Sequence, residues 1–220
     1  MKIFDFIKQV FRGKSISRIL FNWQVQKQCK NLNGVCIDLA SGDNPSYYKY
    51  WQIKNAKLIK IDYNRSKNPD KIIDLNKSLP FENNFADSIF LFNAVYIIKD
   101  PYKLMREINR VLKTGGRLFM NSPFIFNEAR EPDDFRRLTS QGLKNILRKS
   151  SFFDFEIIPY GERFTAGAYL WHSFFIFNFI RLIIFTKALL FDKLIPKKIK
   201  KTHPCPLGYF VIAKKTFINE

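Results

Sequence analysis

Short apolar runs alternate with segments of helical period between Gly34 and about Ser122, and this alternation constrains the fold more than any other feature. An apolar run followed by a helical segment is the pattern of a βα unit, and repeated βα units build a parallel sheet with helices on its faces. We therefore expect an α/β fold. The predicted strands cover residues 35–39, 58–61, 71–75, 88–93, 117–122, 153–160 and 209–215.

Two helices are predicted from the residues at their ends. In the first, residues 100–113, Asp100 can cap the N-terminus, Pro101 suits the first helical position, and Gly115 can close the C-terminus. The second helix is expected to begin near Thr139. The apolar face that packs the first helix on the sheet consists of Leu104, Ile108, Val111 and Leu112.

A chain of 220 residues can bury one substantial core, so we expect one domain with additions. Two segments lie outside the alternation of strands and helices. The predicted parts are a basic amphipathic N-terminal arm at residues 1–33, a core at 34–163, a hydrophobic and basic helical insertion at 164–201, and the final strand at 202–220.

The composition restricts both partners and compartment. A formal charge of +18 favours anionic partners such as nucleic acid, phospholipid or a sugar phosphate, although lysines spread along the whole chain also fit an unspecific basic surface. Cys29, Cys36 and Cys205 form no CxxC pair, so we expect no disulfide framework and no metal site. A reducing compartment, the cytoplasm, fits best, and the charged residues near the start make a poor secretory signal.

The stretch IDLASGDNP, residues 37–45, combines an apolar strand, a turn of small residues, and Pro45 at the expected start of a helix. Such a turn lets a ligand approach the backbone at the carboxyl end of the strand, where open α/β sheets bind cofactors. Asp62 ends the next strand, 20 residues beyond Gly42, and its carboxylate can accept hydrogen bonds from both ribose hydroxyls of an adenosine. Since Gly42 is the only glycine of the turn, no dinucleotide fingerprint can be drawn.

The stretch IDLASGDNPSYYKYW, followed by IKIDYN, resembles the first two motifs of class I methyltransferases that use S-adenosylmethionine, of the type 11 kind. The resemblance continues in order through residues 69–90, 100–120 and 131–147. It implies a Rossmann-like, doubly wound, mostly parallel sheet, with one antiparallel strand near the C-terminus and a helical insertion before the last strand.

The resemblance also implies roles for individual residues. The backbone of Ala40, Ser41 and Gly42 would hold the methionine end of the cofactor, with Asp38 near its amino group. The remaining cofactor residues would be Asp62 at the ribose, Tyr63 on the adenine, Asp74 and Leu75 at the adenine edge, and Asn93 near the methyl group. Alternatively, Asp38 and Asp74 are ordinary carboxylates at strand ends, and Tyr63 is a surface aromatic.

The chain departs from the family pattern at two places. Ala40 and Asn44 stand at glycine positions of the first motif, and Tyr96 and Ile97 stand where the family often has Glu-His. A binding protein without catalytic activity on a methyltransferase-like fold is therefore an alternative to the enzyme.

Transfer of a methyl group needs a general base only if the acceptor is a hydroxyl or a protonated amine. The candidates for this base are Asp133, Asp134 and His172, although a lone histidine in an aromatic stretch is more often a packed residue. Arg136 and Arg137 can hold an acceptor phosphate or form surface ion pairs. The block EPDDFRRLT resembles methyltransferases found with cell-envelope polysaccharide enzymes, which implies a small acceptor, such as a sugar, or a lipid-linked one.

Residues 164–180 carry no formal charge and are rich in Phe, but this run is short for a transmembrane helix. With PKKIKK at residues 196–201, it predicts either helices lying on the inner face of an anionic membrane or a lid over the acceptor site. A basic chain also fits an RNA methyltransferase, but we find no appended RNA module and no aromatic-basic RNA motif, so nucleic acid is the less favoured partner.

Overall fold

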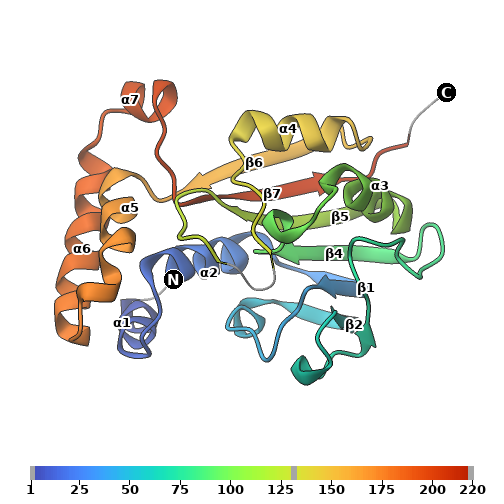
Figure 1. The fold of residues 1–220 in the computed structure, drawn as a ribbon, viewed down its shortest axis with the longest axis horizontal. Coiled ribbons are helices and arrows are strands. Elements are labelled where there is room, and N and C mark those ends of the chain that lie inside the picture. The colour runs from blue at the N-terminus through green and yellow to red at the C-terminus, as the bar shows by residue number, and fades with distance from the viewer. Residues whose placement is uncertain (1–2, 130–132, 218–220) are drawn as a thin grey trace.

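The computed structural model describes residues 3–129 and 133–217, and these residues form a seven-stranded sheet in the order β3-β2-β1-β4-β5-β7-β6 (Figure 1). Neighbouring strands are parallel except at β7, which runs antiparallel to both β5 and β6. This topology confirms the predicted mostly parallel sheet with one antiparallel strand. The strands are β1 (Leu32–Leu39), β2 (Ile53–Asp62), β3 (Lys71–Ile72), β4 (Ala86–Phe92), β5 (Leu112–Pro123), β6 (Asp154–Tyr160) and β7 (Gly208–Lys214).

Helices cover both faces of the sheet, and each face has its own apolar core. One core joins the sheet to α3 and α4, and the other joins it to α2, α5 and α6. The helices are α1 (Ile3–Phe11), α2 (Ile16–Gln28), α3 (Pro101–Val111), α4 (Ser140–Arg148), α5 (Arg163–Leu170), α6 (Asn178–Leu194) and α7 (Lys197–Thr202).

The N-terminal helices and the insertion pack on the second core instead of standing apart from the sheet. Phe6 and Val10 of α1, Phe21 of α2 and Phe185 of α6 are all buried in it. Figure 1 shows α1, α5 and α6 grouped beyond the edge of the sheet toward which the arrowheads of β4 and β6 point. This group of helices therefore flanks the carboxyl ends of the parallel strands. Within the described residues, we find no helix with the length and apolar character needed to cross a bilayer.

The predicted caps are confirmed, but one helix end is wrong. The Asp100 side chain accepts a hydrogen bond from the Lys103 N–H (3.0 Å), and the Thr139 side chain accepts one from the Gly142 N–H (3.1 Å). The helix predicted to reach residue 113 ends at Val111, because Leu112 already pairs with β4. Gly115, expected to close that helix, instead lies within β5, where the register with β4 shifts and its φ is +81°.

Two further expectations fail near the carboxyl ends of β1 and β2. The strand predicted over residues 71–75 is shortened to Lys71–Ile72, after which the chain turns across the ends of the neighbouring strands. The helix expected to start at Pro45 is only a 3₁₀ turn, Tyr48–Tyr50.

Candidate active site

The turn after β1 has a left-handed backbone at alternate residues. The φ angles are +56° at Ala40, +63° at Gly42 and +43° at Asn44. Glycine adopts this conformation freely and asparagine tolerates it, but an alanine in it costs roughly 1–2 kcal/mol. The two non-glycine residues therefore keep a glycine-like path of the turn, and the cost is concentrated at Ala40.

Hydrogen bonds join this turn to the end of β2. The Ser41 N–H donates to the Ile61 carbonyl (2.8 Å), and the Gly42 N–H donates to Asp62 Oδ2 (2.9 Å). Asp62 Oδ1 accepts a further hydrogen bond from the Asn64 N–H (2.9 Å). The carboxylate is thus held at both oxygens while only 8% of the residue is exposed, and each oxygen keeps acceptor capacity.

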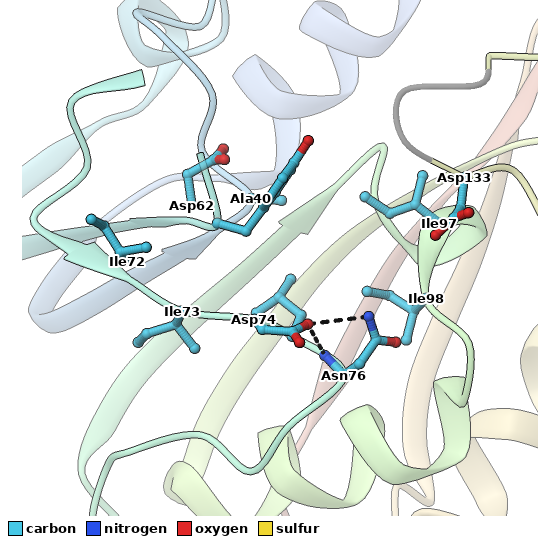
Figure 2. Close-up of a pocket in the computed structure, with 11 residues that line it drawn as sticks. Ala40, Asp62, Ile72, Ile73, Asp74, Asn76, Ile97, Ile98 and Asp133 are labelled. Atoms are coloured by element: carbon cyan, nitrogen blue, oxygen red, sulfur yellow. Dashed lines mark hydrogen bonds between the residues drawn. The ribbon is translucent and has the colours of Figure 1, made fainter. Parts of the chain in front are cut away.

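A cavity of about 370 Å³ opens at these strand ends (Figure 2). In Figure 2, Asp62 and Ala40 lie on one side of it, and Asp133 and Ile97 lie on the other. Isoleucine and leucine side chains supply most of its wall, with a few polar groups between them. The lining residues are Ala40, Asp62, Tyr63, Ile72, Ile73, Asp74, Leu75, Asn76, Ile97, Ile98 and Asp133.

The structure brings together six residues that the sequence singled out: Ala40, Asp62, Tyr63, Asp74, Leu75 and Asp133. Ile72, Ile73 and Asn76 escaped notice because residues 71–75 were expected to form a regular strand. Ile97 was noted only as a departure from the family pattern, and Ile98 was not noted, because the 3₁₀ turn after β4, Val95–Ile97, was not predicted. Residues 73–76 cross the ends of the neighbouring strands, and this path places their side chains on the cavity wall.

Asp74 is oriented by its neighbour on the cavity wall. Its Oδ1 accepts hydrogen bonds from the Asn76 backbone N–H (2.9 Å) and from Asn76 Nδ2 (3.2 Å), as Figure 2 shows. The backbone hydrogen bond, together with the side-chain one, lowers the pKa of Asp74 below its ordinary value. Asp74 is therefore an ionised acceptor at neutral pH.

Asp38 is a fully buried carboxylate behind the turn. Its Oδ2 accepts hydrogen bonds from Tyr47 Oη (2.9 Å) and Tyr48 Oη (2.8 Å), whereas its Oδ1 has no hydrogen-bond partner. Burial raises the pKa of Asp38 to about 7, although the two tyrosine hydroxyls oppose the rise. The unpartnered oxygen is suited to a cationic donor, because such a donor would favour the ionised form. Neither tyrosine was predicted as a site residue, although both stand in the stretch IDLASGDNPSYYKYW that resembles the first motif.

Like Asp38, the three remaining predicted cofactor residues do not line the cavity. Ser41 is buried in the turn, and Gly42 is hydrogen bonded to Asp62. Asn93 has a φ of +53°, and its Oδ1 accepts a hydrogen bond from Asn121 Nδ2 (2.6 Å). This pairing ties the end of β4 to β5.

The acidic and basic residues of the stretch 131–137 have different roles: one faces the cavity, and others hold their own loop in place. Glu131 and Pro132 lie outside the described residues. Asp133 lines the cavity, but Asp134 forms a bidentate ion pair with Arg137 (Nη2 to Oδ2, 2.7 Å), which lowers the pKa of Asp134. Arg136 donates to the backbone carbonyls of Ile98 and Lys99. The pair and these hydrogen bonds hold the loop in place.

His172 lies away from the cavity, in an aromatic row. Its ring stacks on Tyr169 (centroids 5.3 Å apart), Tyr169 stacks on Phe126 (5.9 Å), and Phe126 contacts Tyr96 (6.0 Å). The Arg137 guanidinium lies over the rings of Tyr96 and Phe126. The row connects the insertion to the turn after β4 and forms an aromatic wall beside Ile97.

The arrangement suits an adenosine-type ligand more than a metal-dependent reaction. Apolar side chains, a fixed carboxylate and an ionised acceptor share one cavity at the carboxyl end of a parallel sheet. In the part of the chain that the structure describes, no group of three or more His, Cys, Asp or Glu side chains could hold a metal ion.

Comparison with known proteins gives a family match and a curated relative. Residues 48–120 match the family model of a methyltransferase domain. A tRNA U34 carboxymethyltransferase of Campylobacter concisus (strain 13826) is 26% identical over 130 residues, which cover 54% of this chain and 43% of that protein. The chain therefore spans less than half the length of this curated relative.

Solved structures share the fold at low sequence identity. A SAM-dependent methyltransferase from Archaeoglobus fulgidus has a TM-score of 0.59 and 16% identity, and the match covers 97% of this chain and 100% of that one. Phosphoethanolamine N-methyltransferase 2 of Haemonchus contortus, in complex with S-adenosyl-L-methionine, has a TM-score of 0.57 and 15% identity, over 90% and 52% of the two chains.

The strain at Ala40 predicts that Ala40→Gly stabilises the protein by about 1 kcal/mol, because glycine adopts the left-handed conformation without a Cβ clash. Urea unfolding measures this change. Ala168→Gly, inside α5, is the matched control and should destabilise by about 1 kcal/mol, since glycine weakens a helix interior. Equal destabilisation by both substitutions would show that the turn does not hold Ala40 in strain.

The environment of Asp38 predicts a pH dependence of stability. Because the folded-state pKa is raised to about 7, the Asp38 contribution to stability is present at low pH and is lost as the pH rises through about 7. Asp38→Asn should remove this loss, so the difference in free energy of unfolding between variant and parent should shift in favour of the variant as the pH rises.

Asp74→Asn is the control for this prediction, with the opposite sign. The pKa of Asp74 is lowered, so its contribution is lost as the pH falls. Urea unfolding of both variants over a pH series gives the two trends, and a pH-independent difference for Asp38→Asn would contradict the environment described for Asp38.

Proposed function

We propose that this chain is a class I methyltransferase that uses S-adenosylmethionine, and that it transfers the methyl group to a lipid-linked acceptor, with a sugar or other small polar head, at an anionic membrane surface. The observation that carries the proposal is the cavity at the ends of β1 and β2, with Asp62 held on its wall. The lipid-linked nature of the acceptor is supported by the apolar helices α1, α5 and α6, which flank the same edge of the sheet (Figure 1).

The residues of the cavity fit the parts of the cofactor. The fixed Asp62 carboxylate suits the two ribose hydroxyls, and the ionised Asp74 suits the amino group of the adenine. Ile73 and Ile97 offer apolar surface to the adenine ring. Asp38 does not line the cavity, but its unpartnered Oδ1 behind the turn suits the ammonium of the methionine end, whose positive charge would draw the pKa of Asp38 down again.

The sulfonium of the bound cofactor supplies an electrophilic methyl group, so the protein has mainly to position the acceptor and, where needed, remove a proton. Asp133, on the cavity wall, is better placed for the proton than Asp134, which is engaged with Arg137. The rings of Tyr96 and Phe126, tilted by 44° to each other, provide aromatic surface against which the apolar face of a sugar can pack. Arg137 lies over these rings but is paired with Asp134 through both carboxylate oxygens, so it orders this aromatic wall and does not offer a free charge to a phosphate.

RNA is the rival acceptor, and it is favoured by the name of a relative, a tRNA U34 carboxymethyltransferase. The net charge of +18 also suits phosphate contacts along a nucleic acid. Against RNA, the exposed surface near the carboxyl ends of the strands is made of aliphatic and Phe side chains, which cannot read base edges by hydrogen bonding.

Incubation with S-adenosylmethionine labelled in its methyl group decides between these acceptors. Lipid extract and total RNA from the organism that encodes the protein are offered separately, and we expect label in the lipid fraction. Label confined to RNA would overturn the proposed acceptor while keeping the methyltransferase.

Asp62→Ala should weaken cofactor binding about 10- to 100-fold, since two hydrogen bonds to a charged group are lost, and should lower the transfer rate at limiting cofactor accordingly. Asp154→Ala, an exposed carboxylate at the start of β6, is the matched control. Equal rates for the two variants would show that Asp62 does not hold the cofactor.

A further inference from the structure

Large apolar side chains are exposed together on the helices that flank the strand ends. The loop between α5 and α6 exposes Trp171 (62%), Phe174 (72%), Ile176 (80%) and Phe177 (58%). Phe4 of α1 and Leu194 of α6 are 80% and 76% exposed. We call this surface, centred on the loop of residues 171–177, the apolar face.

Helix α1 is held next to the start of α6 and the loop of residues 171–177, while Leu194 extends the apolar face to the other end of α6. Asn178 Nδ2, at the start of α6, donates to the carbonyl of Phe11 at the end of α1 (3.2 Å). A groove of about 410 Å³, lined mainly by apolar side chains of α1, α2 and α6, opens between these helices. Figure 1 shows α1 beside one end of α6, with the α5–α6 loop at that same end. A surface of this extent is unusual on a soluble monomer and marks a site of interaction.

The helix α6 has more apolar surface than the protein buries. Phe185 and Ala188 pack into the core, whereas Ile183, Leu190 and Phe191 on other sides of the helix remain largely exposed. A helix that is apolar on nearly all sides normally has all of them covered. Within the described residues, nothing from the chain itself covers this second side.

Charge identifies the kind of partner. Residues 163–205 contain eight Lys and Arg residues and one carboxylate, Asp192. Asp192 is buried and accepts hydrogen bonds from Thr165 Oγ1 (2.6 Å) and the Phe164 N–H (2.9 Å), so it does not offset the positive surface. Lys197 and Lys198 of α7 are exposed just beyond Leu194, at the end of α6 opposite to the loop of residues 171–177 (Figure 1). Exposed Phe, Trp and Ile side chains with lysines around them match an anionic lipid surface.

We propose that the apolar face docks on a bilayer containing anionic lipids with α6 lying along the surface, so that residues 171–177 at one end of α6 insert at the level of the upper acyl chains and the α7 lysines at its other end meet the head groups. Trp171 is suited to this depth, because indole rings favour the interface between head groups and hydrocarbon. A second copy of this chain is a poorer partner, because two such faces would bring like charges together. The docking deepens the proposed function, on which it rests for the membrane location of the acceptor, but the docking itself requires neither cofactor nor acceptor.

The test uses the full chain and vesicles of phosphatidylcholine with phosphatidylglycerol in equal amounts, compared with vesicles of phosphatidylcholine alone. Cosedimentation should show binding to the anionic vesicles and much less to the neutral ones. The double variant Phe174→Ser, Ile176→Ser should bind at least about tenfold more weakly, because both exposed side chains lose their contact with acyl chains. Phe153→Ser, an exposed phenylalanine between α4 and β6, is the matched control and should bind like the parent.

A second pair of variants tests the head-group contact. Each lysine near an anionic surface contributes about a fivefold gain in binding, so Lys197→Gln, Lys198→Gln should lower binding to anionic vesicles about 25-fold. Lys144→Gln, Arg148→Gln on α4 makes the same change of charge away from the face and should have little effect.

Insertion is read from Trp171 fluorescence, which should shift to the blue and be quenched by brominated acyl chains, and Trp171→Phe should remove most of both signals. Equal losses of vesicle binding for the face variants and their controls would overturn the proposal. It would also be overturned if the protein bound no vesicles and instead dimerised or bound RNA in a way that Phe174→Ser, Ile176→Ser abolished. Binding of S-adenosylhomocysteine by calorimetry is measured on each variant, so failure to dock is distinguished from failure of the cofactor site.

Discussion

The hydrogen bonds that the Asp62 carboxylate accepts from Gly42 and Asn64 are the constraint on which the candidate site depends. They join the turn after β1 to the end of β2, so the two strands finish at the same level with a carboxylate fixed between them. A nearly buried carboxylate requires donors on both oxygens, and here the backbone supplies them, leaving acceptor capacity for a ligand. The cavity wall at residues 72–76 is then completed by a chain that leaves the sheet after only two paired residues.

The structure explains how the first motif tolerates residues other than glycine at two of its glycine positions. Ala40 and Asn44 both keep the left-handed backbone that glycine would adopt, so the path of the turn is preserved at the expense of local strain. Strain of this kind persists only where surrounding contacts hold the chain, and the hydrogen bonds of Ser41 and Gly42 to β2 are such contacts. The departures from the family pattern are therefore compatible with an intact cofactor turn.

Much of the fold follows from local pattern. The alternation of apolar runs predicted where along the chain each of the seven strands lies, and the cap residues Asp100 and Thr139 predicted where α3 and α4 begin. The short β3, the 3₁₀ turn after Pro45 and the position of Gly115 within β5 could not be predicted, because each depends on contacts with residues distant in sequence. In the site, the position of Asp62 at the end of a strand could be predicted from the sequence. The hydrogen bonds from Tyr47 and Tyr48 to Asp38 could not, because they depend on the three-dimensional path of the turn. The same holds for the ion pair of Asp134 with Arg137, which depends on the side-chain conformations in its loop.

The central claim is that the cavity beside Asp62 seats S-adenosylmethionine, and a crystal structure with S-adenosylhomocysteine tests it most directly. The account predicts both ribose hydroxyls within hydrogen-bonding distance of the Asp62 carboxylate, the adenine between Ile73 and Ile97, and the methionine ammonium at Asp38 Oδ1. An adenosyl group bound elsewhere, or one whose ribose points away from Asp62, would contradict it.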